Sequence, residues 1–205
     1  MLDHVLIWIN GLRHEVRGRE AFLSLSDYLR RVLGLVGTKI VCSEGDCGAC
    51  SVLVGRIATD GSRLVYHPVD SCIQFLFQLD GTHVVTVEGL GGEQDPSPVQ
   101  QAMIEHHGSQ CGYCTPGFVV AMTGLLEERD QLDATVMRCG LTGNLCRCTG
   151  YSPIMEAGRQ IDVGQHERIE QRFPSAAMLR EMQRRRDKQI QVRANWDDEE
   201  HTFIS

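Results

Sequence analysis

Nine cysteines constrain this chain of 205 residues more than any other feature, and all of them lie before residue 149. The N-terminus has no basic segment followed by an apolar stretch, so we expect no signal peptide and a cytoplasmic location. Reducing compartments do not sustain disulfide scaffolds, and an odd number of cysteines fits such a scaffold poorly. The cysteine content therefore predicts metal binding.

The first three cysteines follow the pattern C-x4-C-x2-C, and a fourth cysteine follows after 21 intervening residues. This is the spacing of plant-type [2Fe–2S] ferredoxins. Gly45 and Gly48 allow the loop to wrap tightly and to point backbone N–H groups at the sulfur atoms, which offsets their negative charge. The spacing favours an iron–sulfur cluster over zinc or buried thiols. The candidate ligands are Cys42, Cys47, Cys50 and Cys72.

The second set of cysteines forms two close pairs, C-x2-C and C-x-C, separated by 31 residues. Each pair could hold one iron, and the C-x-C pair is tighter than most structural zinc sites. Spacing alone leaves zinc open as an alternative. The candidate ligands are Cys111, Cys114, Cys146 and Cys148. The ninth cysteine, Cys139, has no close partner, so we expect a packed free thiol.

The composition excludes several function classes. A formal net charge of −7 argues against a nucleic-acid or membrane-surface binder, which would carry a basic stripe. No apolar run approaches ~18 residues, so we expect no membrane span. The sequence contains no dinucleotide fingerprint, Ser-His-Asp pattern or paired carboxylates, so we assign no catalytic residue.

The chain divides into three predicted parts. Residues 1–90 show strand patterns, including a hairpin at Asn10-Gly11, with short helices over 24–33 and 71–77. Residues 91–97 concentrate turn residues and predict a linker. The apolar period then becomes helical, so 91–162 is predicted to form a small bundle of four helices. Residues 163–205 contain no cysteine and form a C-terminal connector or arm.

Three segments carry a resemblance to a known family. They are EGDCGACSV at 44–52, GSQCGYCTPGF at 108–118 and LTGNLCRCTGY at 141–151. These segments resemble the xanthine dehydrogenase (molybdenum hydroxylase) family, and within it the iron–sulfur part of bacterial small subunits. The resemblance covers about residues 4–160 and includes all eight ligand positions.

The resemblance implies an α+β fold, with an N-terminal β-grasp ferredoxin-like domain followed by a four-helix-bundle [2Fe–2S] domain. It implies electron transfer through two [2Fe–2S] clusters, from a molybdopterin site on a large partner subunit to FAD on a flavin-binding subunit or domain, and then to NAD or another acceptor. The bundle cluster would lie nearest the pterin, with Gln110 and Cys148 at positions that hydrogen-bond the pterin in relatives. A heteromeric complex, dimerised or not, is the expected assembly.

The substrate would be bound by the molybdenum chain, so this sequence gives little information about the identity of the substrate. Residues 44–47 and 97–103 resemble the purine branch, which favours xanthine. Aldehydes, carbon monoxide, nicotinate-type rings and aromatic thioesters are the alternatives within the family. A free ferredoxin-like carrier is an alternative of another class, although it would need only the first cluster. A zinc-stabilised interaction protein is a third hypothesis.

The last 43 residues extend beyond the usual short iron–sulfur subunit. A helix starting at Pro174 and Ser175 would carry an apolar stripe, and the apolar residues after it predict extended chain. A helix of ~13 residues is marginal alone, so the stripe needs a surface. We therefore expect this arm to pack across a neighbouring subunit, with a frayed tail as the alternative, and its removal to weaken assembly.

Overall fold

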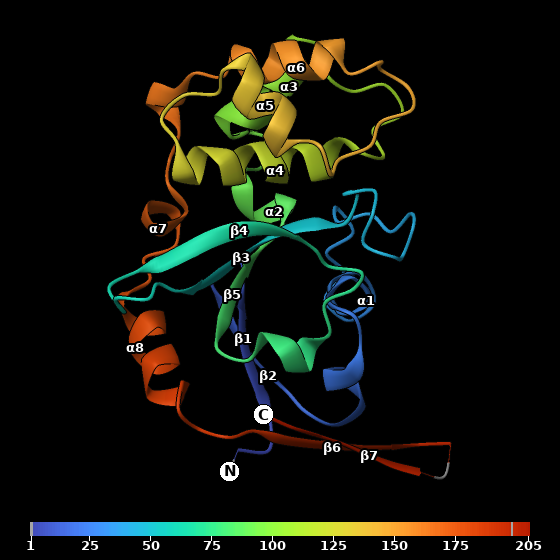
Figure 1. Cartoon of the computed structure of the whole chain (residues 1–205), viewed down its shortest axis with the longest axis vertical. Helices are drawn as coiled ribbons and strands as arrows, with labels where there is room; N and C mark the ends of the chain where they lie inside the picture. The colour runs from blue at the N-terminus through green and yellow to red at the C-terminus, as the bar shows by residue number, and fades with distance from the viewer. Residues whose placement is uncertain (1, 198) are drawn as a thin grey trace.

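The computed structural model describes residues 2–197 and 199–205, and begins with the predicted hairpin (Figure 1). Asn10 and Gly11 have φ values of 48° and 80°, as a tight hairpin turn between the first two strands requires. Five strands form one sheet in the order β2-β1-β5-β3-β4, with β1 and β5 parallel. Its strands are β1 (Val5–Ile9), β2 (Leu12–Val16), β3 (Ser51–Ile57), β4 (Leu64–Asp70) and β5 (Thr82–Val85).

Helices cover both faces of this sheet (Figure 1). On one face, α1 (Leu25–Asp27) continues as a wider helical turn, Tyr28–Val32. The other face carries the helical half, whose main helices are α3 to α6. The fold is therefore α+β, with a ferredoxin-like part followed by a helical part. The helices of this half are α2 (Val87–Leu90), α3 (Pro98–Glu105), α4 (Thr115–Glu128), α5 (Ala134–Gly140) and α6 (Ser152–Arg159).

Strand β1 is buried along its whole length because it separates two cores. Leu6 and Trp8 point into a core shared with the helical half, which includes Phe118 and Val119 of α4. The alternate residues of β1 point into a second core beneath α1. Alternate side chains of a strand lie on opposite faces, so an almost wholly apolar strand indicates a sheet covered on both sides.

The prediction of a helix over 71–77 is wrong. Cys72 lies in a turn after β4, and helical structure begins only at the short 3₁₀ turn Leu76–Leu79. The Ser71 hydroxyl donates a hydrogen bond to the Cys50 carbonyl oxygen at 2.7 Å, and the Ser26 N–H donates to the Ser71 carbonyl oxygen at 3.1 Å. These bonds hold the segment beside two other elements, which overrides its local helical preference.

The C-terminal segment first packs on the helical half. It contains a 3₁₀ turn, Val163–Gln165, and α7 (Ile169–Arg172), whose Ile169 is buried in the shared core. The Arg168 guanidinium donates hydrogen bonds to the carbonyl oxygens of Leu126 and Glu127 at the end of α4. It also forms an ion pair with Asp130. Arg168 thus caps α4, whose last carbonyl groups lack helical partners.

The segment then crosses to the ferredoxin-like half of its own chain. Helix α8 (Ala176–Arg185) buries Met178 and Met182 in the shared core. A hairpin of β6 (Gln191–Trp196) and β7 (Glu199–Ile204) follows, and buries Ile190 and Val192 in the core beneath α1. The expectation of helix and then extended chain is confirmed. The arm nevertheless packs on its own chain, so its removal would expose both cores and would not isolate an effect on assembly.

Arg185, at the end of α8, makes the main polar contact of this segment. Its Nε donates to both carboxylate oxygens of Asp80, at 2.8 and 2.9 Å, and its Nη2 donates to the carbonyl oxygen of His4. The Arg185 side chain is 8% exposed. Asp80 also accepts a hydrogen bond from the N–H of Leu6 at 2.8 Å, so the ion pair joins α8 to the start of β1.

In the described residues, no helix has both the length and the apolar character needed to span a membrane.

Candidate metal centres

The first candidate centre is the loop between the α1 region and β3. Ser43, Gly45 and Gly48 have φ values of 61°, 75° and 68°, which wind the backbone tightly. A Cβ atom on Gly45 would collide with the side chain of Ile73, next to Cys72. The loop thus lies against the turn that carries the fourth cysteine, and both glycines serve the role that the sequence predicts for them.

The three thiols of this loop lie close to one another and to the thiol of Cys72. Cys42 is a neighbour of Cys47, and Cys50 is a neighbour of Cys72. Backbone N–H groups of Glu44 and Asp46 donate to the Cys42 sulfur and lower its pKa to about 6. Burial raises the pKa of the Cys50 thiol to about 12. The loop therefore supplies the amide dipoles that stabilise an anionic sulfur, as the sequence predicts.

The second candidate centre lies where two connections of the helical half meet, the one between α3 and α4 and the one between α5 and α6. Cys114 immediately precedes α4, and Pro116 occupies its first turn, as predicted. The four thiols of the two motifs lie close together: Cys111 is a neighbour of Cys148, and Cys114 is a neighbour of Cys146. Which two thiols would share one iron stays a prediction.

The pKa values of this second set are shifted in opposite directions. The backbone N–H of Tyr113 is the main cause that lowers the pKa of Cys111. Burial opposes ionisation of Cys146, but hydrogen bonds from Thr149 and the Cys148 N–H outweigh it and lower the pKa. Burial raises the pKa of Cys114 to about 12. Each set thus combines thiols that favour the thiolate with a thiol buried deeper in the protein.

The donor chemistry fits a binuclear cluster. A [2Fe–2S] cluster takes four thiolates, two on each iron, and both sets supply four thiols. Across residues 2–197 and 199–205, no three His, Cys, Asp or Glu side chains converge as ligands of a single ion. Within that same part of the chain, Thr38 Oγ1 is a buried side-chain atom without a hydrogen-bond partner. It lies four residues before Cys42 in the sequence.

The two candidate centres are in direct contact through the backbone. The N–H of Leu145, beside Cys146, donates to the carbonyl oxygen of Cys47 at 3.0 Å. The Asn144 side-chain amide donates to the Gly48 carbonyl oxygen at 3.1 Å. The same oxygen lies so close to Gly117 that a Cβ atom there would collide with it. A backbone hydrogen bond thus links Cys47 of the first centre to Leu145, the residue next to Cys146 of the second centre.

The two centres differ in their exposure. In the first set, Cys50 is buried and the other three thiols are half-buried. In the second, Cys111 and Cys148 are exposed, as is Gln110, the residue predicted to meet a pterin. Cys139 on α5 is also exposed, so it is a free thiol as expected but is not packed. The second centre thus has an edge open to a partner.

Asp70, at the end of β4, is a neighbour of the first centre that cysteine spacing does not reveal. The Cys50 thiol donates to its carboxylate at 3.7 Å, and burial raises the pKa of this carboxyl group. The residue pairs with Ser51 across the β3–β4 ladder. The register between β3 and β4 places Asp70 beside Cys50, and the cysteine pattern contains no information about this register.

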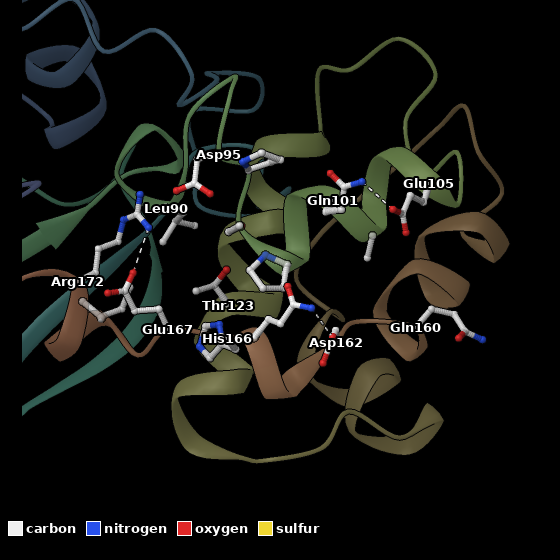
Figure 2. Close-up of a pocket in the computed structure, with 16 residues that line it drawn as sticks. Leu90, Asp95, Gln101, Glu105, Thr123, Gln160, Asp162, His166, Glu167 and Arg172 are labelled. Atoms are coloured by element: carbon white, nitrogen blue, oxygen red, sulfur yellow. Dashed lines mark hydrogen bonds and ion pairs between the residues drawn. The ribbon is translucent and has the colours of Figure 1, made fainter.

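A cavity of about 460 Å³ lies apart from both centres, between the helical half and the start of the C-terminal segment (Figure 2). Gln101 and Glu105 lie on one side of it, and Glu167 and Arg172 on the other. Glu167 and Arg172 form an ion pair at 3.3 Å, and Gln101 donates to Glu105 at 2.6 Å. The cavity is lined by no cysteine, so it contributes no ligand to the centres.

Two family models match the chain. Residues 7–70 match a 2Fe-2S iron-sulfur cluster binding domain, and residues 86–159 match a [2Fe-2S] binding domain. The first match contains three of the four cysteines of the first set, and the second contains the whole second set. The fold and the two sets of thiols therefore belong to a protein with two [2Fe–2S]-binding domains.

Known relatives identify the family. The chain is 43% identical over 157 residues to xanthine dehydrogenase 1 of Arabidopsis thaliana, and 40% identical over 157 residues to xanthine dehydrogenase/oxidase of Rattus norvegicus. These matches cover 75% and 77% of this chain, but only 11% and 12% of those relatives. The chain thus spans about a tenth of the length of the curated relatives it matches.

Two solved structures that are similar to this chain support the same family. Quinoline 2-oxidoreductase of Pseudomonas putida 86 matches with a TM-score of 0.65 and 32% identity, covering 89% of this chain and 97% of that one. Aldehyde oxidoreductase of Desulfovibrio gigas matches with a TM-score of 0.67 and 36% identity, covering 77% of this chain and 16% of that one. The chain belongs to the xanthine dehydrogenase (molybdenum hydroxylase) family, as its iron–sulfur part.

Proposed function

We propose that this chain carries electrons through two [2Fe–2S] clusters, between a molybdopterin site and a flavin, both on partner chains or domains. Each cluster, when bound, accepts and releases one electron at a time. The observation that carries the proposal is the meeting of eight cysteines in two sets of four, at two centres joined by the Leu145–Cys47 hydrogen bond. We assign the first cluster to Cys42, Cys47, Cys50 and Cys72, and the second to Cys111, Cys114, Cys146 and Cys148.

The exposed edge of the second centre supports a direction for this transfer. Gln110, Cys111 and Cys148 are accessible to a partner, as a contact with the pterin requires. We therefore propose that Gln110 and Cys148 hydrogen-bond the pterin of a molybdenum-binding large subunit. The first centre would then face the flavin. The three proposed functional parts of the chain are 1–90, 91–162 and 163–205.

The relatives support two forms of assembly. The matched chain of the quinoline enzyme is covered along 97% of its length, as expected for a separate iron–sulfur subunit. The plant xanthine dehydrogenase is covered along only 11%, as expected for one part of a longer chain. We propose a heteromeric complex located in the cytoplasm. Xanthine is the proposed substrate because xanthine dehydrogenases recur among the relatives, and an aldehyde or a ring such as quinoline is the alternative.

Iron analysis tests the two-cluster proposal directly. We expect about four irons and four acid-labile sulfides per chain, because two [2Fe–2S] clusters require them. Reduced protein should show two distinct rhombic EPR signals. A single signal with half of that iron would contradict the proposal, and a colourless zinc-containing protein would favour the interaction-protein hypothesis. Assays of the complex with xanthine, benzaldehyde and quinoline would identify the substrate.

A pair of cysteine substitutions tests the ligand assignment. Cys148→Ser should abolish or distort one EPR signal, because a serine oxygen is a poorer ligand for iron than a thiolate. Cys139→Ser is the matched control, since Cys139 is equally exposed in the same half of the chain. It should leave both signals and the iron content unchanged. Loss of a signal in the control, with both signals retained in Cys148→Ser, would reverse the assignment.

A further inference from the structure

A cavity of about 380 Å³ lies at the C-terminal end of α8. Its walls come from four separate parts of the chain: the end of β3, the turn before β5, the residues after α8, and the end of β7. Parts of the chain more than 100 residues apart thus form one site.

The charge of this cavity is the opposite of the charge of the whole chain. The side chains of Arg56, Arg185, Arg186 and Lys188 line it, and Asp80 supplies its one acidic side chain. Asp80 is already neutralised, since Arg185 donates to both of its carboxylate oxygens. The cavity therefore has an excess of three cations in a chain whose formal net charge is −7.

These three cations lack acidic partners. Within residues 2–197 and 199–205, no carboxylate lies within ion-pair distance of Arg56, Arg186 or Lys188. A basic run at the C-terminal end of a helix is favoured by the helix dipole, and this accounts for Arg186. It does not account for Arg56, which reaches the cavity from β3.

The chemistry of the walls indicates the class of ligand. Arginine and lysine together favour phosphate groups, through forked hydrogen bonds and a compact charge respectively. At ~30 Å³ for each water molecule, the cavity has the volume of about a dozen waters, which is room for a phosphate or diphosphate. The rings of Phe77 and Phe203, stacked at 4.4 Å, form an apolar part of the wall.

We infer that Arg56, Arg186 and Lys188 form a binding site for a small phosphate-bearing anion. This site is separate from the proposed electron transfer and does not depend on it. Arg185 is held by Asp80, so it shapes the wall and leaves the other three cations to contact the anion. Inorganic phosphate, pyrophosphate and the diphosphate of a nucleotide share this chemistry.

Titration calorimetry of the full chain with pyrophosphate, inorganic phosphate and ADP tests this inference. We expect saturable binding of at least one probe, weakened by added salt because the attraction is electrostatic. The double substitution Arg56→Gln/Lys188→Gln should lower the affinity at least tenfold. If ADP binds more tightly than pyrophosphate, the aromatic wall contacts the adenine base. If the two bind equally, only the phosphate groups are recognised.

A double substitution elsewhere provides the control. Arg19→Gln/Arg193→Gln removes the same charge from two exposed positions outside the cavity and should leave the affinity unchanged. All four residues are exposed, so both variants should keep the thermal stability of the parent protein. Equal affinities of the two double variants, or no binding of any probe, would overturn the inference.

Discussion

Replacing Arg185 with methionine is expected to destabilise the protein by about 2–3 kcal/mol, because the change leaves the half-buried Asp80 carboxylate without its cation. Methionine has a similar helix propensity and a similar apolar length at the end of α8. The measured loss of stability therefore reflects the loss of the Arg185 guanidinium and its contacts. Arg185 also holds the carbonyl oxygen of His4, which would lose its hydrogen bond. Urea denaturation measures the loss, and limited proteolysis should show faster cleavage within 163–205.

Arg184 provides the matched control for this experiment. It is the adjacent residue of α8, but its side chain is exposed. Arg184→Met should change the free energy of unfolding by less than about 0.5 kcal/mol. Adding Asp80→Asn to Arg185→Met should restore part of the stability, because no buried charge then remains unpaired. A loss in Arg185→Met no larger than that in Arg184→Met would show that the ion pair does not hold the segment in place.

Gly117→Ala is expected to destabilise the protein by about 3 kcal/mol, although helix propensity alone predicts a gain of about 1 kcal/mol. The reason is the collision of the new Cβ atom with the Gly48 carbonyl oxygen, which cannot move without shifting the first cysteine loop. The two effects have opposite signs, so the sign of the measured change decides between them. Urea denaturation gives this sign, and iron analysis shows whether the loops still retain metal.

Gly143→Ala is the control for this substitution. Gly143 lies in the second cysteine loop, but a Cβ atom there would have no neighbour within 4 Å. Its φ does not lie in the left-handed region, so alanine should be tolerated. A stability change below about 1 kcal/mol is expected. If Gly117→Ala stabilised the protein, the close approach of α4 to the first loop would be wrong.

The sequence predicts the parts of this molecule that depend on local pattern. The Asn10-Gly11 turn is confirmed because its backbone conformation is available to few other residue pairs. The four helices of the second half follow from the apolar period and from Pro116 at the start of α4. Cysteine spacing also locates both candidate centres, since a tight loop brings neighbouring thiols together whatever lies outside it.

The sequence pattern does not predict contacts between residues that are far apart in the chain. Cys111 lies close to Cys148, which is 37 positions away, and the spacing within each motif does not show that the two motifs meet. The predicted helix over 71–77 failed because the Ser71 hydroxyl bonds the Cys50 carbonyl oxygen, a contact between distant elements. The ion pair of Arg185 with Asp80 spans 105 positions, and without it the apolar stripe of α8 could equally suit a partner.

The shared core on one face of the sheet limits how such chains can be recombined. Leu6 and Trp8 of β1 pack in the same core as Phe118 of α4, and Met182 of α8 joins them. The helical half therefore shares its interior with one face of the sheet, and thermal unfolding should follow a single cooperative transition. A chimaera that joined the ferredoxin-like half of one relative to the helical half of another would need matched side-chain volumes across this face. Exchange of the whole chain would keep this shared face intact, so we expect it to preserve folding where exchange of one half would not.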